Sequence, residues 1–339
     1  MNKNKGRNNL MSFLTVFTTI LVVAGHCDMT PEYKNTWIFR WVYSFHMPLF
    51  FFISGFLFCL TNPIKRMAVT KLSSFIKKKT IRLIIPFVII DSIIFIIKAT
   101  LFADNEVVQH PIELSLSSYF NHIFINPIGF MWFLPTLFLI FILSFPVWRF
   151  IKNHSNPSKI IFITSLIIYT LSTIASFDMD AIKFFQFSRA IYYLAFFWTG
   201  IIYCEFSSII DKFLKKYWFV ILFISGTASI FFIGGHLMRI SMGILLSITI
   251  GLLISDRIPL SVLNCTAFTY TIYLLSYFPQ MLVRGPIYHS CAHLNINQYW
   301  FSALSFILGL SVPIIFSIIY NIIQSKKPSL KRIGFIFGL

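Results

Sequence analysis

The stretch FHMPLFFFISG, residues 45–55, lies within an apolar run that covers residues 37–60. About 20 apolar residues are enough for a helix to cross a bilayer. A second apolar run, residues 10–27, precedes it. Each run contains one histidine, His46 or His26. An ionisable side chain at membrane depth is costly and usually faces a bundle interior, where it binds or reacts. The two histidines are therefore the first candidates for chemistry.

The composition predicts an integral membrane protein. Apolar residues make up 57% of the 339 residues and charged residues only 12%, against roughly 25% charged residues in soluble domains. The first run lacks a small-residue cleavage site, so we expect it to stay as a helix. We predict one all-α domain over residues 1–339, a polytopic bundle of about ten transmembrane helices. Their expected ranges are 10–28, 37–60, 83–103, 129–148, 160–177, 185–206, 217–234, 238–255, 260–282 and 299–323.

The net charge of +17 is mostly a topology signal. With ten spans, alternate connections hold 21 of the 28 basic residues, from Lys3 in the N-terminal segment to Arg332 near the C-terminus. The opposite connections hold few, among them Lys34, Lys98 and Lys183. The positive-inside rule then predicts cytoplasmic termini. A nucleic-acid partner would need a basic face on a folded soluble domain, so we expect none.

Several short motifs follow one another in a fixed order. They are Gly25-His26, residues 45–55, KTIRLIIPF at 79–87, MWFLP at 131–135, FFWTG at 196–200 and YTIYLL at 270–275. In this order they resemble the acyltransferase-3 family of integral membrane O-acyltransferases, and especially its fucose 4-O-acetylase-like branch. The resemblance implies a ten-helix bundle in a cell (inner) membrane. It also implies transfer of an acyl group, commonly acetyl from acetyl-CoA, to a hydroxyl of a surface polysaccharide or lipid-linked glycan.

Three positions depart from the family pattern. The family usually has an acidic and then a basic residue early in the first span, where this chain has Ser12 and Thr15. The ninth span commonly has a histidine where this chain has Ser276. Eleven helical residues are about three turns, so the missing base would share the face of His26. We take Arg40 as the candidate replacement, and a non-catalytic family member remains the alternative.

The predicted donor site is the basic loop after the second span. Lys78, Lys79 and Arg82 suit phosphate groups of acetyl-CoA, because lysine offers a point charge and arginine a bidentate fork. The alternative is a purely topological anchor. His26, about 24 Å along the helix from Leu10, is expected in the outer half of the membrane. The donor's long flexible arm would have to reach it from the cytoplasmic side.

At His26 two mechanisms remain open. A neutral histidine can take the proton of a sugar hydroxyl near pH 7, or it can carry the acyl group itself. His46 could orient the acceptor or share the proton path. The alternative for both is a packing histidine that hydrogen-bonds a neighbouring helix.

Three further residues are expected to bind the substrate: Arg40, Trp132 and Arg189. The alternatives are snorkelling for the two arginines and an interfacial belt for Trp132. Five cysteines without metal-ligand spacing predict no metal. The first rival function is a transporter or flippase for a lipid-linked glycan, although the chain lacks the internal symmetry common in transporters. We expect the lipid bilayer and a glycan acceptor as partners, and the oligomeric state stays open.

Overall fold

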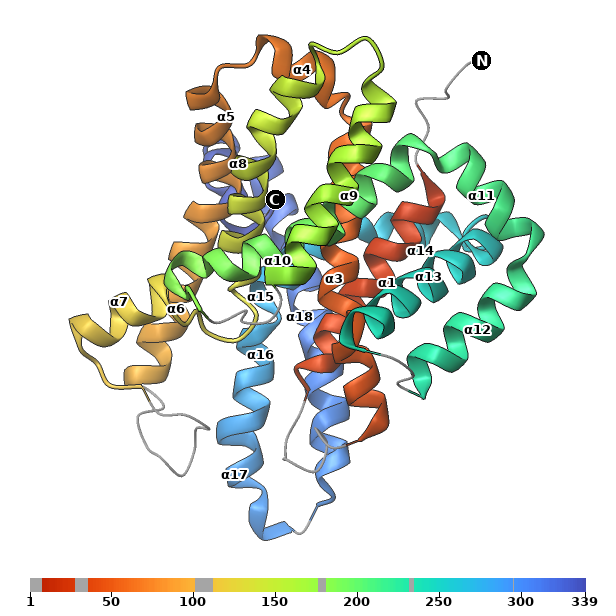
Figure 1. Ribbon diagram of the computed structural model, residues 1–339. Coiled ribbons are helices and arrows are strands. Elements are labelled where there is room, and N and C mark those ends of the chain that lie inside the picture. Colours follow the sequence, from red (N-terminus) through yellow and green to blue (C-terminus); the bar gives the residue numbers. More distant parts are fainter. Residues whose placement is uncertain (1–7, 28–35, 101–111, 176–180, 232–234, 295) are drawn as a thin grey trace.

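The computed structural model describes residues 8–27, 36–100, 112–175, 181–231, 235–294 and 296–339. All regular structure in this part of the chain is helical, as Figure 1 shows, which confirms the all-α prediction. Five helices are long and apolar enough to cross a membrane, or six if a pair bent by 88° counts as one span. The predicted total of ten spans stays a prediction. The basic residues Lys3, Lys5, Arg7 and Lys34 lie outside the described residues.

Nine of the ten predicted segments coincide with one helix each. These are α1 (Asn9–Gly25), α3 (Trp37–Leu60), α6 (Ile85–Thr100), α8 (Phe133–Ile151), α9 (Pro157–Ala175), α10 (Phe187–Glu205), α12 (Trp218–Ile230), α13 (His236–Ile254) and α18 (Gln298–Lys326).

The ninth predicted segment is broken instead. It consists of α14 (Leu260–Asn264), the 3-10 turn η4 (Cys265–Ala267), α15 (Thr269–Leu275) and α16 (Tyr277–Leu282), and it continues through the π-helix η5 (Val283–Ile287) into α17 (Tyr288–Ser290). Short helices that the periodicity did not predict are α4 (Pro63–Val69), α5 (Leu72–Lys79), α7 (Leu116–Phe124) and α11 (Ser207–Lys216).

The first two long helices begin at polar caps. The side chain of Asn8 accepts a hydrogen bond from the Met11 amide, and that of Thr36 accepts one from the Phe39 amide. Such caps satisfy amides that the helix itself leaves unpaired. In a bilayer this matters more than in water, because lipid offers no replacement partner.

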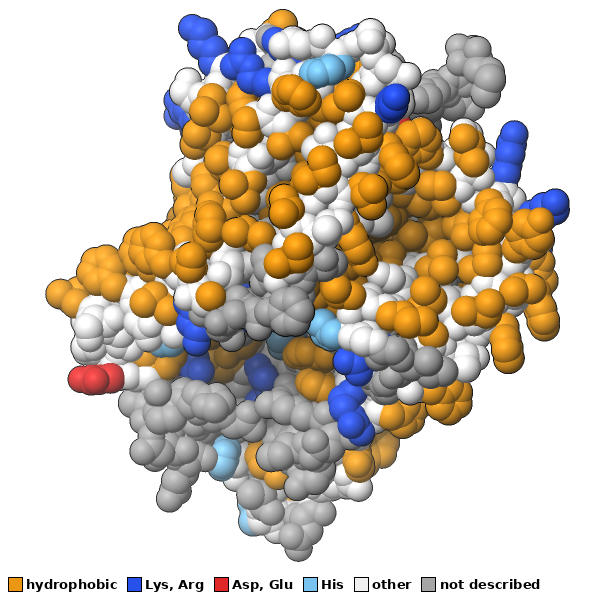
Figure 2. Space-filling model, viewed as in Figure 1, with side chains coloured by type: hydrophobic (Ala, Val, Ile, Leu, Met, Phe, Trp, Pro, Cys, Tyr) orange, Lys and Arg blue, Asp and Glu red, His pale blue; other side chains and the backbone are white. Residues whose placement is uncertain are grey.

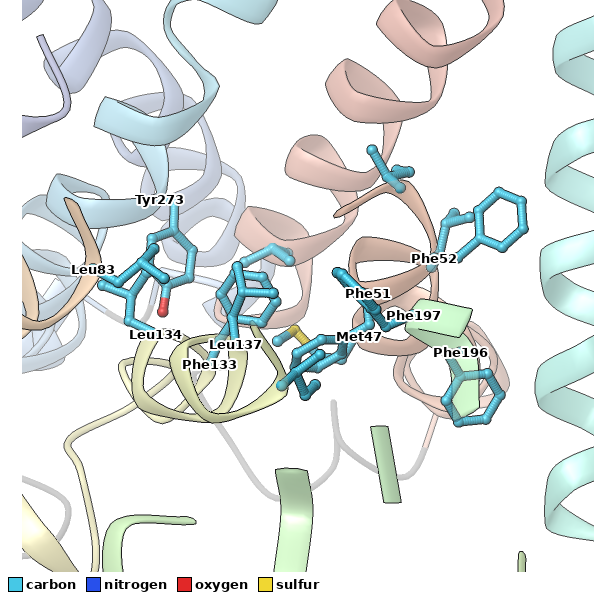
Figure 3. Close-up of a cluster of buried hydrophobic side chains, with 14 of the residues drawn as sticks. Met47, Phe51, Phe52, Leu83, Phe133, Leu134, Leu137, Phe196, Phe197 and Tyr273 are labelled. Atoms are coloured by element: carbon cyan, nitrogen blue, oxygen red, sulfur yellow. The ribbon is translucent and has the colours of Figure 1, made fainter. Parts of the chain in front are cut away.

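Helices α3 and α10 pack closely through two glycines. A methyl group at Gly55 would overlap the carbonyl oxygen of Phe197, and one at Gly200 would overlap that of Phe52. Small residues let two backbones approach in this way. Figure 3 shows Phe51, Phe52 and Phe197 beside this contact, and it shows the α8 residues filling the space towards Tyr273. Gly55 and Gly200 thus allow the close approach of α3 and α10.

The outer flank of the bundle is apolar. Figure 2 shows hydrophobic side chains over the flank. Several Lys and Arg side chains lie at the end that carries α4 and α5, called here the basic end, and others lie lower on the same face. Helix α18 illustrates the pattern, since only 17% of its apolar 18-residue stretch is buried inside the protein. An apolar surface of this extent suits lipid, and the chain is a multi-pass membrane protein.

Candidate functional site

A cavity of about 370 Å³ opens between α3, α8 and α15, near the basic end. Three basic side chains, six residues with hydroxyl groups from α1, the C-terminal half of α3 and the α15 region, and a wall of apolar side chains line it. The polar lining residues include Thr15, Ser54, Thr61, Arg66, Lys79, Arg82, Thr269, Tyr270 and Tyr273. This volume lies within the range of small-molecule sites.

The three cations of the cavity come from two neighbouring segments. Arg66 belongs to α4, and its guanidinium lies 5.1 Å from the centre of the Phe58 ring. Burial lowers the pKa of Arg66 from its ordinary value, yet an arginine stays charged at neutral pH. Arg82 is exposed at the cavity edge, and Lys79 at the end of α5 is half-buried. Lys78 is exposed and is not part of the cavity lining.

Lys79 is held by aromatic rings. Its ammonium lies 3.1 Å from the centre of the Phe141 ring and 5.6 Å from the centres of both Phe58 and Phe75. A cation over an aromatic face is attracted by the negative charge of that face. The rings therefore hold the Lys79 amine at the cavity wall, where the surroundings are otherwise apolar.

A π-helical segment, η1 (Thr80–Ile84), carries Arg82. Pro86, one turn further along, has no N–H to donate to the Arg82 carbonyl. The Tyr270 hydroxyl donates to that carbonyl instead, at 2.6 Å. This bond joins α15 to the segment that places Arg82, and it explains why an irregular helix persists at the cavity edge.

His26 directly follows α1 and lies beside two aromatic rings. Its ring centre is 4.8 Å from that of Phe130 and 6.0 Å from that of Tyr43. The Tyr43 hydroxyl donates to the Gly25 carbonyl at 3.0 Å and lies 3.4 Å from Nδ1 of His26. Because that hydroxyl has one proton, its oxygen can accept from Nδ1–H of the neutral imidazole. In this tautomer Nε2 carries the lone pair that a base needs.

His46 also contacts Tyr43. It is 2% exposed, and its ring centre is 4.9 Å from that of Tyr43. Its Nδ1 lies 2.8 Å from the Val42 carbonyl oxygen, which can only accept, so Nδ1 holds the proton. Tyr43 thus contacts both predicted catalytic histidines.

An aromatic layer separates His26 from the cavity. Tyr273 lines the cavity, its hydroxyl donates to the Phe130 carbonyl at 2.7 Å, and the two ring centres are 5.2 Å apart. Phe133 also lines the cavity, 5.5 Å from Tyr273. Phe130 contacts His26 from the far side of this layer.

The structure brings together two of the three predicted substrate residues. The Arg189 guanidinium lies 5.1 Å from the centre of the Trp132 ring and donates to Gln186 at 2.9 Å. Trp132 in turn stacks on Tyr193 at 5.4 Å. Arg40 is exposed in the first turn of α3, on the same helix face as Tyr43 three residues later.

Several site residues were missed by the sequence interpretation. Arg66 joins Lys79 and Arg82 in the cavity, and its neighbour Lys65 in a basic pair was a signal for it. Tyr43 stands one turn before His46, a spacing that could have been used. Tyr270 was visible only as part of a family motif. Within the described residues no three His, Cys, Asp or Glu side chains gather in a way that could hold a metal ion.

A lipid-facing helical bundle with a cavity lined by basic side chains defines a multi-pass membrane protein with a candidate small-molecule site. The chain matches the family model described as an acyltransferase domain over residues 13–322, and it belongs to the acyltransferase-3 family. It is therefore a membrane acyltransferase. No significant match was found among curated proteins or among solved structures.

Proposed function

We propose that this protein transfers an acetyl group from cytoplasmic acetyl-CoA to a sugar hydroxyl of a surface polysaccharide or lipid-linked glycan. The observation that carries the proposal is the cavity in which Arg66, Lys79 and Arg82 converge at the basic end of the bundle. By the positive-inside rule this end and both termini belong in the cytoplasm, and the membrane is the cell (inner) membrane.

The cationic end of the cavity suits the phosphates of the donor. Arg66 and Arg82 offer forked donors that match phosphate oxygens, and the Lys79 amine adds a further hydrogen-bond donor. Lys78 faces solvent beside them, so the donor proposal rests on the three cations that line the cavity. Thr15 lies in the same lining, at the position where the family usually has a base.

The donor's acyl group has to travel along α1. From Thr15 to His26 is eleven residues, or about 16 Å of helix. The pantetheine arm of acetyl-CoA is long and flexible, and the apolar lining suits its thioester end. The arm would meet Phe133 and Tyr273 first, so transfer at His26 requires Phe130 and Tyr273 to part.

Two balanced routes lead from there to the product. In the first, Nε2 of His26 takes the proton of the sugar hydroxyl, the oxygen attacks the thioester carbonyl, the carbon–sulfur bond breaks, and the proton passes from Nε2 to the departing sulfur of coenzyme A. In the second, Nε2 attacks the thioester carbonyl and the carbon–sulfur bond breaks, which leaves the acetyl group on Nε2. The sugar oxygen then attacks that acetyl group, the bond from Nε2 to the acetyl carbon breaks, and the sugar proton passes to the thiolate of coenzyme A. Tyr43 orients His26 in both routes, and His46 packs against the Tyr43 ring.

Trp132 and Arg189 are the proposed acceptor platform. The apolar face of a sugar packs on an aromatic ring, and a neighbouring guanidinium donates to its hydroxyls, a combination of apolar surface and directed polar groups typical of ligand sites. Arg40, on the face of α3 that presents Tyr43, is proposed to contact the acceptor as well.

The test measures acetyl transfer to the cell's surface glycan at matched membrane abundance. His26→Ala should abolish O-acetylation, and retained O-acetylation would refute the role of His26. Loss of glycan export with intact O-acetylation of the exported material would favour the transporter. Unaltered glycan chemistry on deletion of the whole protein would favour a non-catalytic family member.

Donor binding is tested separately on purified protein. The double variant Arg66→Gln, Arg82→Gln should weaken acetyl-CoA binding by tenfold or more, since charge-assisted hydrogen bonds contribute about 1.5–3 kcal/mol each. Lys77→Gln is the matched control, because Lys77 is an exposed α5 residue outside the cavity lining. If the double variant and the control bind acetyl-CoA with equal affinity, these basic residues only set the membrane topology.

A further inference from the structure

Asp91 is a carboxyl group inside an apolar helix, and the chemistry proposed above does not use it. It lies in the middle of α6 and is 0% exposed. Oδ1 accepts a hydrogen bond from the Ile128 amide at 3.0 Å, and Oδ2 has no hydrogen-bond partner among the described residues. A polar group at this depth is expensive, so a compensating role is expected.

The segment that Asp91 holds is the loop of residues 125–132, between α7 and α8. Its central residues Ile128, Phe130 and Met131 are buried although the loop has no regular helix. A buried loop in a membrane bundle needs partners for its backbone groups, because neither lipid nor a helix supplies them. Asp91 supplies the partner for the Ile128 amide.

Two parts of the proposed site depend on this loop: the surroundings of His26 and the platform of Trp132 and Arg189. Phe130 lies against His26 at 4.8 Å, two residues after the Asp91 contact. Trp132 follows after two more residues and carries the Arg189 guanidinium. At the other end of the loop, Gln186 donates to the Ile125 carbonyl at 2.7 Å. The Asp91 bond thus holds the loop two residues before Phe130, and the Tyr273 hydroxyl holds the Phe130 carbonyl itself.

We propose that Asp91 is a positioning residue, which fixes the loop so that Phe130 stands against His26 and Trp132 stands under Arg189. The inference rests on the proposed function only for its effect on transfer. Asp91 acts through the Ile128 amide and touches neither substrate.

The test compares Asp91→Asn with Asp91→Leu in the full-length protein. Asparagine keeps a carbonyl oxygen for the Ile128 amide, while leucine removes it. With leucine, hydrogen exchange in peptides covering residues 125–132 should become about tenfold faster, the change that about 1.4 kcal/mol of lost local stability produces. O-acetylation of the surface glycan should fall, and acetyl-CoA affinity should stay within twofold of wild type.

The asparagine variant should keep both the exchange protection of residues 125–132 and the O-acetylation of the wild type. Because leucine adds bulk, Asp91→Ala is measured alongside and should show the same faster exchange. Ser92→Ala is the control, since Ser92 lies on the same helix and bonds Tyr119 rather than the loop.

Three outcomes overturn the proposal. They are unchanged exchange in both the leucine and alanine variants, loss of O-acetylation in the asparagine variant with protection intact, and acetyl-CoA affinity that falls as far as transfer does. If the wild-type protein transfers no acetyl group, the proposed function fails, but the exchange measurement still decides whether Asp91 anchors the loop.

Discussion

Replacing Gly55 by alanine should destabilise the bundle strongly, because its neighbour is backbone rather than a side chain. The added methyl group would overlap the Phe197 carbonyl oxygen, and a rotamer change cannot relieve a clash with a carbonyl. An ordinary C···O contact is about 3.3–3.6 Å, so α3 and α10 would have to separate by about 1.5 Å.

The energetic cost follows from that separation. A gap of 0.5–1 Å already forfeits about a quarter to a half of a van der Waals contact. The Phe51 and Tyr193 rings stack across this interface with their centres 4.5 Å apart, and they would lose part of their van der Waals contact energy. Overpacking typically costs about 1–3 kcal/mol, and we expect Gly55→Ala near the upper end of that range. Alanine's better helix propensity, about 1 kcal/mol, offsets part of the loss.

The assay is thermal unfolding of the purified protein in detergent micelles. Gly226→Ala is the matched control, since its nearest neighbour would be a Leu246 methyl at an ordinary 3.8 Å. The control should melt at or slightly above the wild-type temperature, and Gly55→Ala several degrees below it. Equal melting temperatures for the two variants would refute the close α3–α10 contact.

Three further predictions concern the site. Tyr270→Phe removes the donor to the Arg82 carbonyl and should cost about 1 kcal/mol, measured as a lower melting temperature; an unchanged value would mean that solvent replaces the hydroxyl. Gly129 has a φ of 60° and faces the Tyr277 ring, so Gly129→Ala should cost at least about 1–2 kcal/mol, and a neutral result would contradict the described loop conformation. Acetyl-CoA affinity should fall with rising salt in the wild type, while a double variant lacking Arg66 and Arg82 should show a flatter dependence; parallel slopes would argue against phosphate contacts there.

The fold class and the helix positions could be predicted because apolar length is a strong local signal. The broken segment around Tyr270 could not, because its helical pieces are each seven residues or fewer and depend on contacts with other helices. Helices α4 and α5 lie in a stretch whose sequence predicts only a basic loop. The sequence therefore indicated Lys79 and Arg82 but missed Arg66, whose place in the cavity depends on how α4 folds back.

The site histidines were identifiable because an imidazole in an apolar run is conspicuous. Their surroundings were not. Tyr43 resembles any aromatic residue of a membrane helix until its hydroxyl is found beside both Gly25 and His26. Asp91 was not singled out, because its partner Ile128 is 37 residues away in the chain. Contacts of this range are set by tertiary packing, which periodicity does not encode.

The aromatic layer of Phe130, Phe133 and Tyr273 has a consequence for the cell as well as for the reaction. An enzyme that receives its two substrates from opposite sides of a membrane is in danger of becoming a leak for protons and metabolites. Under the proposed function, these packed rings, tied by the bond from Tyr273 to the Phe130 carbonyl, would keep the permeability barrier intact while the donor is bound. On the proposed function, small-residue variants of this layer would therefore be detected first as a loss of membrane energisation, before any change in the glycan is measured.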